Sequence, residues 1–502
     1  MSGTVSGFMA YPSEMMLRTI ALAAGILVSF SLFTRGNDTP NILVLLADDL
    51  GYGDLGCYGH PHIRSPHLDR LAEEGMRLTD CYSAAPNCSP ARTGLMTGRT
   101  PWRVGIHNWI PMLSPMHVVE EEVTIATLLR EAGYDTCHTG KWHLNGRFNL
   151  PGQPQPDDHG FDHWFSTQNN ALPNHRNPWN FVRNGIPVGP LEGYAADLVV
   201  DEAIGWLRER PDQAKPFFLF VCFHEPHEPV ASAPRFTRQY EEFDDPSQRA
   251  LYGNVTQLDA AAGKLLAEID SLGLREDTLV FFTSDNGPAI TGRHPYGSSG
   301  DLRAKKGHIW EGGIRVPGIL RWPSRISAGS ESSVPVSGVD LLPTLCELAG
   351  FSPPDDRPID GASIVPVFSG EPVVRKMPLY WHFIRARSEV KVALRDGDWK
   401  IVAGIDREDL TPSGSITEEE GVVYREGELS EFELYHLRED PGETRDLRER
   451  EPERFAAMQA QLRRKYHEVR NESPAWPEWE WPRYESERIG WPDYRPLRKP
   501  PR

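Results

Sequence analysis

Paired polar side chains follow two apolar runs of this chain. Asp48 and Asp49 come directly after NILVLLA, and Asp285 and Asn286 follow the apolar part of DTLVFFTSDNG. Two like charges at the end of a buried strand are costly unless a cation neutralises them. Because all four side chains offer only oxygen, they suit Ca²⁺ or Mg²⁺ better than zinc. A turn or a helix N-cap is the alternative for any one aspartate.

A cysteine with reactive potential lies in the stretch NCSPARTGLMTGR. This stretch begins at Asn87 and places Cys88 two residues before Pro90, where a helix is expected to open. Taken alone, Cys88 could be a buried thiol, half of a disulfide, a nucleophile or the precursor of another group. Arg92 could equally be a surface residue of that helix. The short pattern C-x-P-x-R therefore needs support from the rest of the chain.

Two lysines and two histidines stand in short polar motifs. Lys141 and His143 lie two residues apart in GKWHLN, so on an extended segment both side chains would point to the same side. His227 belongs to HEPHEP, and Lys306 belongs to the glycine-bounded KKGHIWEGG. The alternative is a packing or surface position for each histidine and a solvated surface position for Lys306.

The elements that must position these residues alternate between strands and helices. NILVLLA, PFFLFVCF and DTLVFFTS are typical of buried parallel strands. Segments 65–75, 121–133 and 247–272 predict helices, with Ser65 as an N-cap. This alternation predicts an α/β fold, with a large mixed, mostly parallel sheet between helices. The polar strand ends should then meet at one edge of the sheet, where such folds bind their ligands.

The last part of the chain has a different character. VKVALRDGDWKIVAG predicts a hairpin around Asp396, PERFAAMQAQLRRKYHEV an amphipathic helix, and the Trp- and Pro-rich end an extended tail. No catalytic set is evident there. We therefore expect a leader or anchor at 1–36, a catalytic domain at 37–370 and a C-terminal α+β subdomain with an antiparallel sheet at 371–502.

Composition limits the possible partners. A net charge of −18 over 502 residues argues against nucleic-acid binding, since no basic face is evident to neutralise phosphates. Positive charge for an anionic ligand must therefore be concentrated in its site. The six cysteines are scattered without C-x-x-C spacing, so we expect at most one or two disulfides. The oligomeric state stays open.

The N-terminus indicates export. The apolar run TIALAAGILVSFSLF follows Arg18 and ends before Thr34. It is shorter than the ~20 residues of a spanning helix and follows a basic residue, as a secretory signal does. No clear A-x-A cleavage site follows it, so an uncleaved anchor is the alternative. We expect a periplasmic or extracellular protein, either free or anchored at its N-terminus.

Seven motifs together resemble the formylglycine-dependent (type I) sulfatases of the alkaline-phosphatase-like superfamily. They are NILVLLADDLGYGDLGCYG, CSPARTGLMTGR, GKWHL, PHEP, FFTSDNG, KGHIWEGGIRVP and ELYHLREDPGE, in the family's order over about residues 40–450. Their combination is far more specific than C-x-P-x-R alone. The resemblance implies an alkaline-phosphatase-like fold and a sulfuric ester hydrolase.

The resemblance also implies a modified nucleophile. A formylglycine-generating enzyme, an implied partner, would oxidise Cys88 to Cα-formylglycine. One hydroxyl of the hydrated aldehyde would attack sulfur while the sugar or aryl oxygen leaves, and the second hydroxyl would then expel sulfate. A serine or a thiol lacks that second hydroxyl.

The remaining roles are carried over from the family's motifs. Ca²⁺, or less readily Mg²⁺, would be held by Asp48, Asp49, Asp285, Asn286 and the converted Cys88. Arg92 would steady the formylglycine, while Lys141 and Lys306 would bind sulfate oxygens. His227 would protonate the leaving oxygen and His143 would act as the base, although these two roles could be exchanged.

The loop DHWFSTQNNALPNHRNPWNF supplies candidates for substrate binding. Asn170, or its neighbour Asn169, would contact the sulfate side, and His175 and Arg176 would reach the sugar. Arg303, just before the lysine loop, is a further candidate. A polar loop rich in turn-forming residues is an equally good interpretation of this segment.

The leading hypothesis is a sulfatase acting on sulfate esters of a carbohydrate. An arylsulfatase, or a phosphoester or phosphonate hydrolase of the same fold, is the alternative. Lys141 and Lys306 together with His227 favour a sulfate monoester, whereas a two-zinc phosphatase would need more His and Asp ligands. A third hypothesis is a non-catalytic protein that binds sulfated glycans with an unmodified Cys88.

Overall fold

The computed structural model describes residues 39–407, 410 and 413–492, which belong to one compact unit. The predicted leader or anchor at 1–36 lies outside the described residues. Within them, no helix is both long enough and apolar enough to cross a membrane. The predicted domain boundary after residue 370 stays a prediction.

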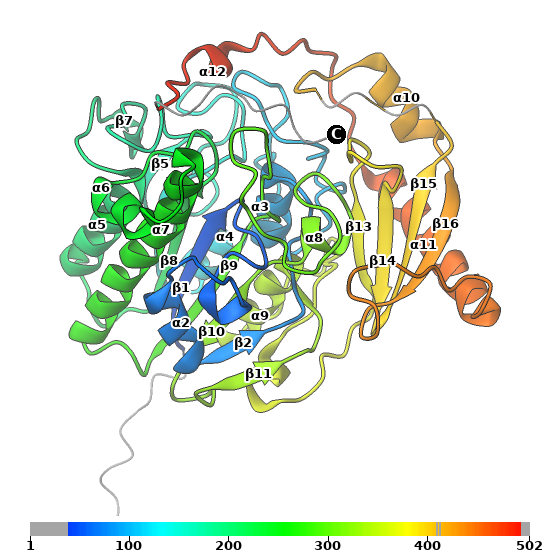
Figure 1. Ribbon diagram of the computed structural model, residues 1–502, viewed down its shortest axis with the longest axis horizontal. Helices are drawn as coiled ribbons and strands as arrows, with labels where there is room; N and C mark the ends of the chain where they lie inside the picture. Colours follow the sequence, from blue (N-terminus) through cyan, green and yellow to red (C-terminus); the bar gives the residue numbers. More distant parts are fainter. Residues whose placement is uncertain (1–38, 408–409, 411–412, 493–502) are drawn as a thin grey trace, which may run out of the picture. The chain divides into compact units, whose positions relative to one another are not determined.

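A ten-stranded sheet forms the centre of the larger part of the fold (Figure 1). In spatial order its strands are β11 (Ser330–Ser332), β2 (Met76–Leu78), β10 (Gly318–Arg321), β9 (Thr278–Ser284), β1 (Asn41–Asp48), β8 (Phe217–Pro226), β4 (Asp135–Lys141), β5 (His163–Thr167), β6 (Val182–Arg183) and β7 (Ile186–Pro187). Pairing is parallel from β9 through β1, β8 and β4 to β5 and between β11 and β2, and antiparallel elsewhere. The predicted mixed, mostly parallel sheet is confirmed.

Helices cover both faces of this sheet. One face packs against α3 (Cys88–Thr97), α4 (Ile125–Glu131) and α9 (Leu341–Leu348), and the other against α2 (Pro66–Glu73), α5 (Ala195–Glu209) and α7 (Pro246–Ser271). Along β1, Val44 and Leu46 belong to the first core, whereas Leu43 and Leu45 belong to the second. The period of two along a strand divides a continuous apolar run between two helical layers.

Shorter elements link these layers. They are η1 (Gly56–Tyr58), β3 (Cys81–Tyr82), α6 (Pro234–Thr237), η2 (Arg238–Tyr240), α8 (Glu311–Ile314), β12 (Val336–Ser337), η3 (Gly338–Asp340) and η4 (Val365–Ser369). The three predicted helices correspond to α2, α4 and α7. The helix expected over 121–133 begins only at Ile125, because the Thr124 side chain caps it by accepting from the Thr127 N–H at 3.2 Å. All six cysteines are free thiols.

A four-stranded antiparallel sheet forms the C-terminal part, as predicted. Its strands are β13 (Leu379–His382), β14 (Val392–Asp396), β15 (Trp399–Ile405) and β16 (Leu429–His436), with α10 (Glu418–Glu426) before β16 and α11 (Pro452–Glu472) packed on the sheet. The predicted hairpin joins β14 to β15, where Asp396 pairs with Trp399. The apolar side of α11 contributes Leu462 and Val469 to the core of this part.

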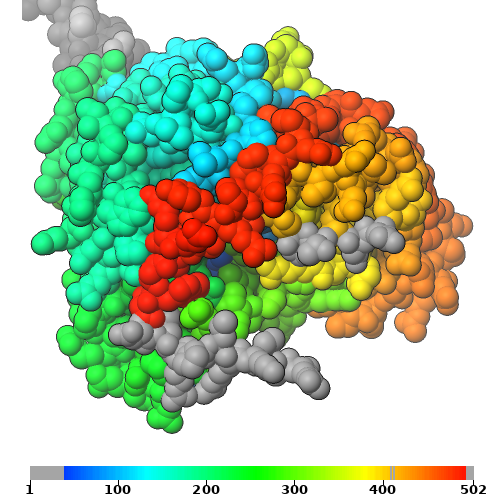
Figure 2. Space-filling view, turned by 90° about the horizontal axis from the view of Figure 1, so that it is seen from above, coloured from blue at the N-terminus to red at the C-terminus, as the bar shows by residue number. Residues whose placement is uncertain are grey.

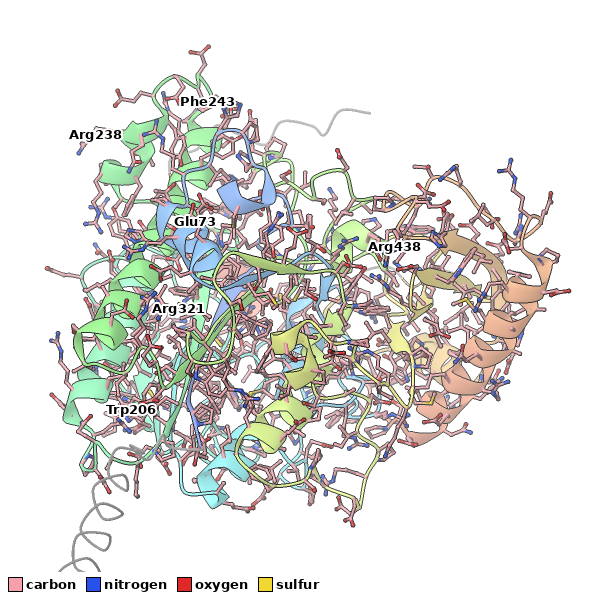
Figure 3. The ribbon with its side chains drawn as sticks, turned by 90° about the horizontal axis from the view of Figure 1, so that it is seen from below. Glu73, Trp206, Arg238, Phe243, Arg321 and Arg438 are labelled. Carbon is pink, nitrogen blue, oxygen red and sulfur yellow. The ribbon has the colours of Figure 1, made fainter. Side chains whose placement is uncertain are left out.

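Polar contacts tie the sheets to their surroundings. Trp381 on β13 is 1% exposed, its indole N–H donates to the Ser83 carbonyl at 2.8 Å, and its ring lies 5.3 Å from that of Tyr82. In the ten-stranded sheet, Arg321 (labelled in Figure 3) lies at the end of β10. It pairs with Glu74 at 3.4 Å and with Asp270 on α7 at 3.2 Å.

Beyond α11 the chain runs back over the molecule in a mostly irregular path that contains α12 (Tyr484–Glu487). Figure 2 shows this segment in red, crossing one face from the C-terminal part to the larger part. Trp479 and Ile416 exchange backbone hydrogen bonds of 2.8 and 3.0 Å. The described part of the Trp- and Pro-rich end, up to residue 492, therefore lies against the surface.

Trp381→Ala should destabilise the protein by about 3–5 kcal/mol, since it leaves a large cavity between β13 and β3. Thermal or urea unfolding would measure this loss. Trp399→Ala on β15, where the side chain is only half-buried, is the matched control and should cost less. Equal losses in both variants would contradict the packing described here.

Candidate active site

The carboxyl ends of β1 and β9 bring the predicted metal ligands together. The two strands are parallel neighbours, and Ala47 pairs with Ser284 where they end. The Asp285 N–H donates to Ala47 O at 3.1 Å, and the Asp49 N–H donates to Asp285 Oδ1 at 3.1 Å. The Asn286 amide donates to Asp49 Oδ1 at 2.7 Å. The neighbouring strand ends thus form one polar cluster.

This cluster is buried and leaves three oxygens without a hydrogen bond. Asp48 Oδ1, Asp49 Oδ2 and Asn286 Oδ1 accept none, although the three residues are at most 3% exposed. Burial raises the pKa of Asp285, and the neighbouring Asp48 carboxylate raises it further. Buried oxygens that repel one another and lack donors are the ligands that a hard cation prefers. The residues present therefore fit the predicted divalent cation.

Arg92 and Lys141 neutralise the cluster from behind. Arg92 on α3 donates through Nε and Nη2 to Asp285 Oδ2 at 3.0 and 2.8 Å, and through Nη1 to the Lys141 carbonyl at 2.8 Å. The Lys141 ammonium, at the end of β4, donates to Asp48 Oδ2 at 2.7 Å. Burial opposes the charge of Lys141, but the Asp48 carboxylate outweighs it and leaves the lysine pKa raised. Both cations are thereby held in fixed positions.

Cys88 is the first residue of α3 and lies beside Lys306. The Asn87 side chain caps the helix by accepting from the Cys88 N–H at 2.9 Å. Lys306 Nζ lies 3.3 Å from Cys88 Sγ and 2.5 Å from Asp49 Oδ1. The helix begins two residues before Pro90, its expected start, so residue 88 stands at the positive end of the helix dipole. This position favours negative charge on a group at Cys88.

His227 and His143 differ in their electrostatic surroundings. His227 Nε2 lies 3.5 Å from Asp49 Oδ2. Burial opposes a charge there, but the Asp49 carboxylate raises the pKa of His227 to about 9. His143 Nε2 donates to Ile110 O at 3.1 Å, and burial with nearby positive charges holds its pKa well below the usual value. Lys141 is the last residue of β4. His143 has a φ of 60°, so the extended segment expected to carry both side chains does not continue to His143.

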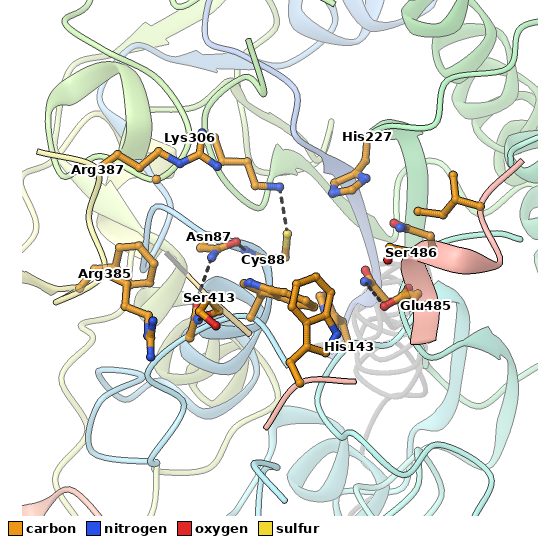
Figure 4. Close-up of a pocket in the computed structure, with 18 residues that line it drawn as sticks. Asn87, Cys88, His143, His227, Lys306, Arg385, Arg387, Ser413, Glu485 and Ser486 are labelled. Carbon is orange, nitrogen blue, oxygen red and sulfur yellow. Dashed lines mark hydrogen bonds between the residues drawn. The ribbon is translucent and has the colours of Figure 1, made fainter. Parts of the chain in front are cut away.

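A cavity of about 300 Å³ opens in front of Cys88 (Figure 4). Of the predicted catalytic residues, four line it: Cys88, His143, His227 and Lys306. Arg92 and Lys141 lie behind these, each 1% exposed or less. Amide and aromatic side chains complete this side of the cavity: Asn87, Asn108, Trp109, Asn169 and Asn170. The cavity therefore joins a charged floor to polar and aromatic walls.

The loop after β5 contributes only part of what was expected. Asn170 lines the cavity beside Asn169, and its expected contact with the sulfate stays a prediction. His175 does not, because its ring turns into the interior, where it is 2% exposed and Nδ1 lies 3.3 Å from the Asn254 amide on α7. The loop residue expected to reach a sugar is thus a packing residue.

Two predicted arginines also lie away from the cavity lining. Arg176 is exposed, and its backbone forms an isolated bridge with Tyr194. The Arg303 guanidinium lies 3.5 Å from the centre of the Trp310 ring and donates to the Glu443 carbonyl at 2.9 Å. The cation–π contact and this hydrogen bond give Arg303 a structural role.

The lining residues that come from the C-terminal part and its tail were not predicted from the sequence. They are Phe383, Arg385, Arg387, Ser413, Trp481, Glu485, Ser486 and Ile489. Burial raises the pKa of the Glu485 carboxyl, although the Asn169 amide counteracts this. The available signal was the Trp- and Pro-rich tail, whose composition predicts surface contact but no location.

Known protein families include one whose sequence model matches most of this chain. The sulfatase family model matches residues 40–351. The chain belongs to the sulfatase family. A second model, the C-terminal region of N-sulphoglucosamine sulphohydrolase, matches residues 304–410. The protein is therefore a sulfuric ester hydrolase, as the seven motifs imply.

Curated relatives match most of this sulfatase. The N-acetylgalactosamine-6-sulfatase of Canis lupus familiaris is 36% identical over 445 residues, which cover 80% of this chain and 81% of the relative. Arylsulfatase A of Homo sapiens is 34% identical over 471 residues, covering 88% and 87% respectively.

Solved structures share the fold. Ps i-CgsB, in complex with k-i-k-neocarrahexaose, has a TM-score of 0.74 and 26% identity, covering 87% of this chain and 94% of that protein. The phosphonate monoester hydrolase of Agrobacterium radiobacter has a TM-score of 0.57 and 18% identity, covering 87% and 96%. The second likeness concerns the fold alone.

Arg92→Met should lower the free energy of unfolding by about 3–5 kcal/mol, because it leaves the buried Asp285 carboxylate without its cation. Urea unfolding measures the loss. Arg208→Met is the control: its pair with Glu268 lies at the surface, with the arginine side chain 61% exposed, so its loss should cost much less. Similar losses for both variants would contradict a central role for Arg92.

Proposed function

We propose that this sulfatase hydrolyses sulfate esters of a carbohydrate with a formylglycine made from Cys88 and a bound Ca²⁺. The observation that carries the proposal is the position of Cys88, which stands at the first turn of α3, beside Lys306 and in front of the carboxylate cluster. The conversion would supply an aldehyde whose hydrate has the two hydroxyls that attack and release require. An unmodified thiol has neither.

The cation would be held by Asp48, Asp49, Asp285, Asn286 and the group at residue 88. When bound, it would offset the repulsion among the carboxylates and polarise a sulfate oxygen. Supporting this, each of three ligand residues has an oxygen free of hydrogen bonds. Ca²⁺ suits this oxygen-rich set better than Mg²⁺, which demands a stricter octahedral geometry.

The sulfate group would be bound by lysine side chains that are held in fixed positions. Lys306 borders the cavity, and its ammonium is held between Cys88 and Asp49. Lys141 stands behind it on Asp48. Because the protein carries a net charge of −18, these local charges must overcome the unfavourable overall field for an anionic substrate. Their burial strengthens each electrostatic contact with a sulfate oxygen.

The two histidines suit opposite directions of proton transfer. His227 donates through Nδ1 to the Glu228 carbonyl at 2.5 Å, and its Nε2 faces the Asp49 carboxylate, which raises the pKa of His227. It is our choice for the acid that protonates the leaving oxygen. His143 stays neutral, and because Nε2 donates to Ile110 O, its Nδ1 is free to accept a proton. It is our choice for the base.

A carbohydrate substrate is supported by the walls of the cavity. Four asparagine side chains line them, and amides exchange hydrogen bonds readily with hydroxyl groups. Trp109 and Trp481 meet edge to face at 5.0 Å and offer apolar surface to a sugar ring. A relative named N-acetylgalactosamine-6-sulfatase and a structural neighbour in complex with k-i-k-neocarrahexaose also support a carbohydrate.

The proposal includes export and a maturing enzyme. Pro90 and Arg92, which belong to the C-x-P-x-R motif, are buried in the folded protein, and Cys88 is only 3% exposed. An enzyme that reads this motif would therefore have to act before the region packs. Export through the apolar N-terminal run would bring the mature sulfatase to extracellular or periplasmic sulfated glycans.

Cys88→Ala should abolish sulfate release from 4-nitrophenyl sulfate and from sulfated sugars, while the Tm stays close to that of the wild type. Ion chromatography of sulfate measures the release. Cys57→Ala, at a half-buried thiol in η1, is the matched control and should keep its activity. Full activity of the Cys88→Ala protein would overturn the proposal.

Calcium should raise the Tm of the wild-type protein, and a chelator should reverse the rise. At a calcium concentration of 100 times Kd the stabilisation is about 2.7 kcal/mol. Asp49→Asn should weaken the response, since it removes a ligand charge, whereas Asp301→Asn, at an exposed aspartate, should leave it unchanged. The same response in all three proteins would show that calcium binds elsewhere.

A further inference from the structure

The C-terminal tail is fixed across the cavity at two points. Near its start, Trp479 pairs with Ile416 by two backbone hydrogen bonds. Near its end, the Gly490 N–H donates to the Pro173 carbonyl at 2.9 Å. Figure 2 shows the tail as a red band on the face that is also hollowed. The segment between these anchors, which includes α12, is therefore a fixed part of the cavity wall.

Glu485 stands out among the tail residues that line the cavity. It is 5% exposed, and the Asn169 amide donates to its Oε2 at 3.2 Å. A backbone N–H, that of Asn170, is its other donor. Among the described residues, Glu485 forms no ion pair within 4 Å. A carboxylate offers about four acceptor positions, so part of its capacity faces the cavity unused.

A carboxylate is an unexpected neighbour for a sulfate. Figure 4 shows Glu485 and Ser486 on the side of His227, and Arg385 and Arg387 on the opposite side. The negative charge of Glu485 would repel the sulfate group, so it contributes nothing to binding it. A buried carboxylate gains most from a donor that completes its hydrogen bonds. On a sulfated sugar the free hydroxyl groups are such donors.

We propose that Glu485 is a specificity-determining residue, whose carboxylate accepts a hydrogen bond from a free hydroxyl of the sugar ring that carries the sulfate. This inference rests on the proposed sulfatase function and adds a residue that reads the sugar. The sulfate end is held by Lys306 near Cys88, while the ring extends toward the tail. An aryl sulfate has no such hydroxyl and makes no use of Glu485. The tail therefore selects sugars over aryl groups.

The test compares two kinds of substrate in matched variants. The probes are 4-nitrophenyl sulfate and a panel of monosulfated hexoses and N-acetylhexosamines. Glu485→Ala should lower kcat/KM for the preferred sugar sulfate about 10- to 100-fold, the range expected for a lost hydrogen bond to a charged group. Its kcat/KM for 4-nitrophenyl sulfate should stay near that of the wild type. Glu485→Gln should lose less on the sugar, because its amide oxygen still accepts a hydrogen bond.

Glu487→Gln is the control, since this residue lies on the same short helix but is exposed and does not line the cavity. It should behave like the wild type on both substrates. An equal fall on both substrates in the Glu485 variants, or no fall on either, overturns the inference. So does a wild-type enzyme that turns over 4-nitrophenyl sulfate but no sugar sulfate. A wild-type enzyme that hydrolyses neither substrate contradicts the proposed function itself.

Discussion

The structure depends on the crowding of carboxylates at the ends of two neighbouring strands. Asp48, Asp49 and Asp285 are buried close together, with the Asp49 N–H donating to Asp285 Oδ1, and their mutual repulsion would open the site if nothing opposed it. Arg92 and Lys141 oppose it from α3 and β4, and Lys306 does so from the loop before α8. Strand order, helix position and loop path must all be correct together for these charges to balance.

The site assigns charge balance and substrate recognition to different parts of the structure. The charged floor is built on regular elements, namely the ends of β1, β9 and β4 and the first turn of α3, which hold side chains in narrow limits. The walls come from loops and from the C-terminal tail. Substrate recognition can therefore vary through the walls without disturbing the floor. Glu485 and Trp481 belong to these walls.

Most residues of the floor could be singled out in the sequence, whereas most residues of the walls could not. Apolar runs that end in Asp48 and Asp285 indicate parallel strands whose polar ends meet, and the register of β1 with β9 bears this out. His175 and Arg303 looked equally polar in the sequence, but a contact with Asn254 and a stack on Trp310 remove them from the cavity. Asn254, like the Glu443 carbonyl that Arg303 also contacts, lies far away in the chain, and no periodic pattern indicates these contacts. For the same reason, the sequence of the tail did not indicate that Glu485 would line the cavity.

Turnover should require a converted Cys88. A direct test pairs the mass of the peptide that contains Cys88 with the rate of sulfate release, in preparations made with and without a formylglycine-generating enzyme. Conversion lowers the mass of that peptide, so the modified fraction can be read directly. The rate of sulfate release should be proportional to this fraction and should fall to zero for the unmodified thiol. Full turnover by protein whose Cys88 is entirely unmodified would show that the formylglycine is not the nucleophile.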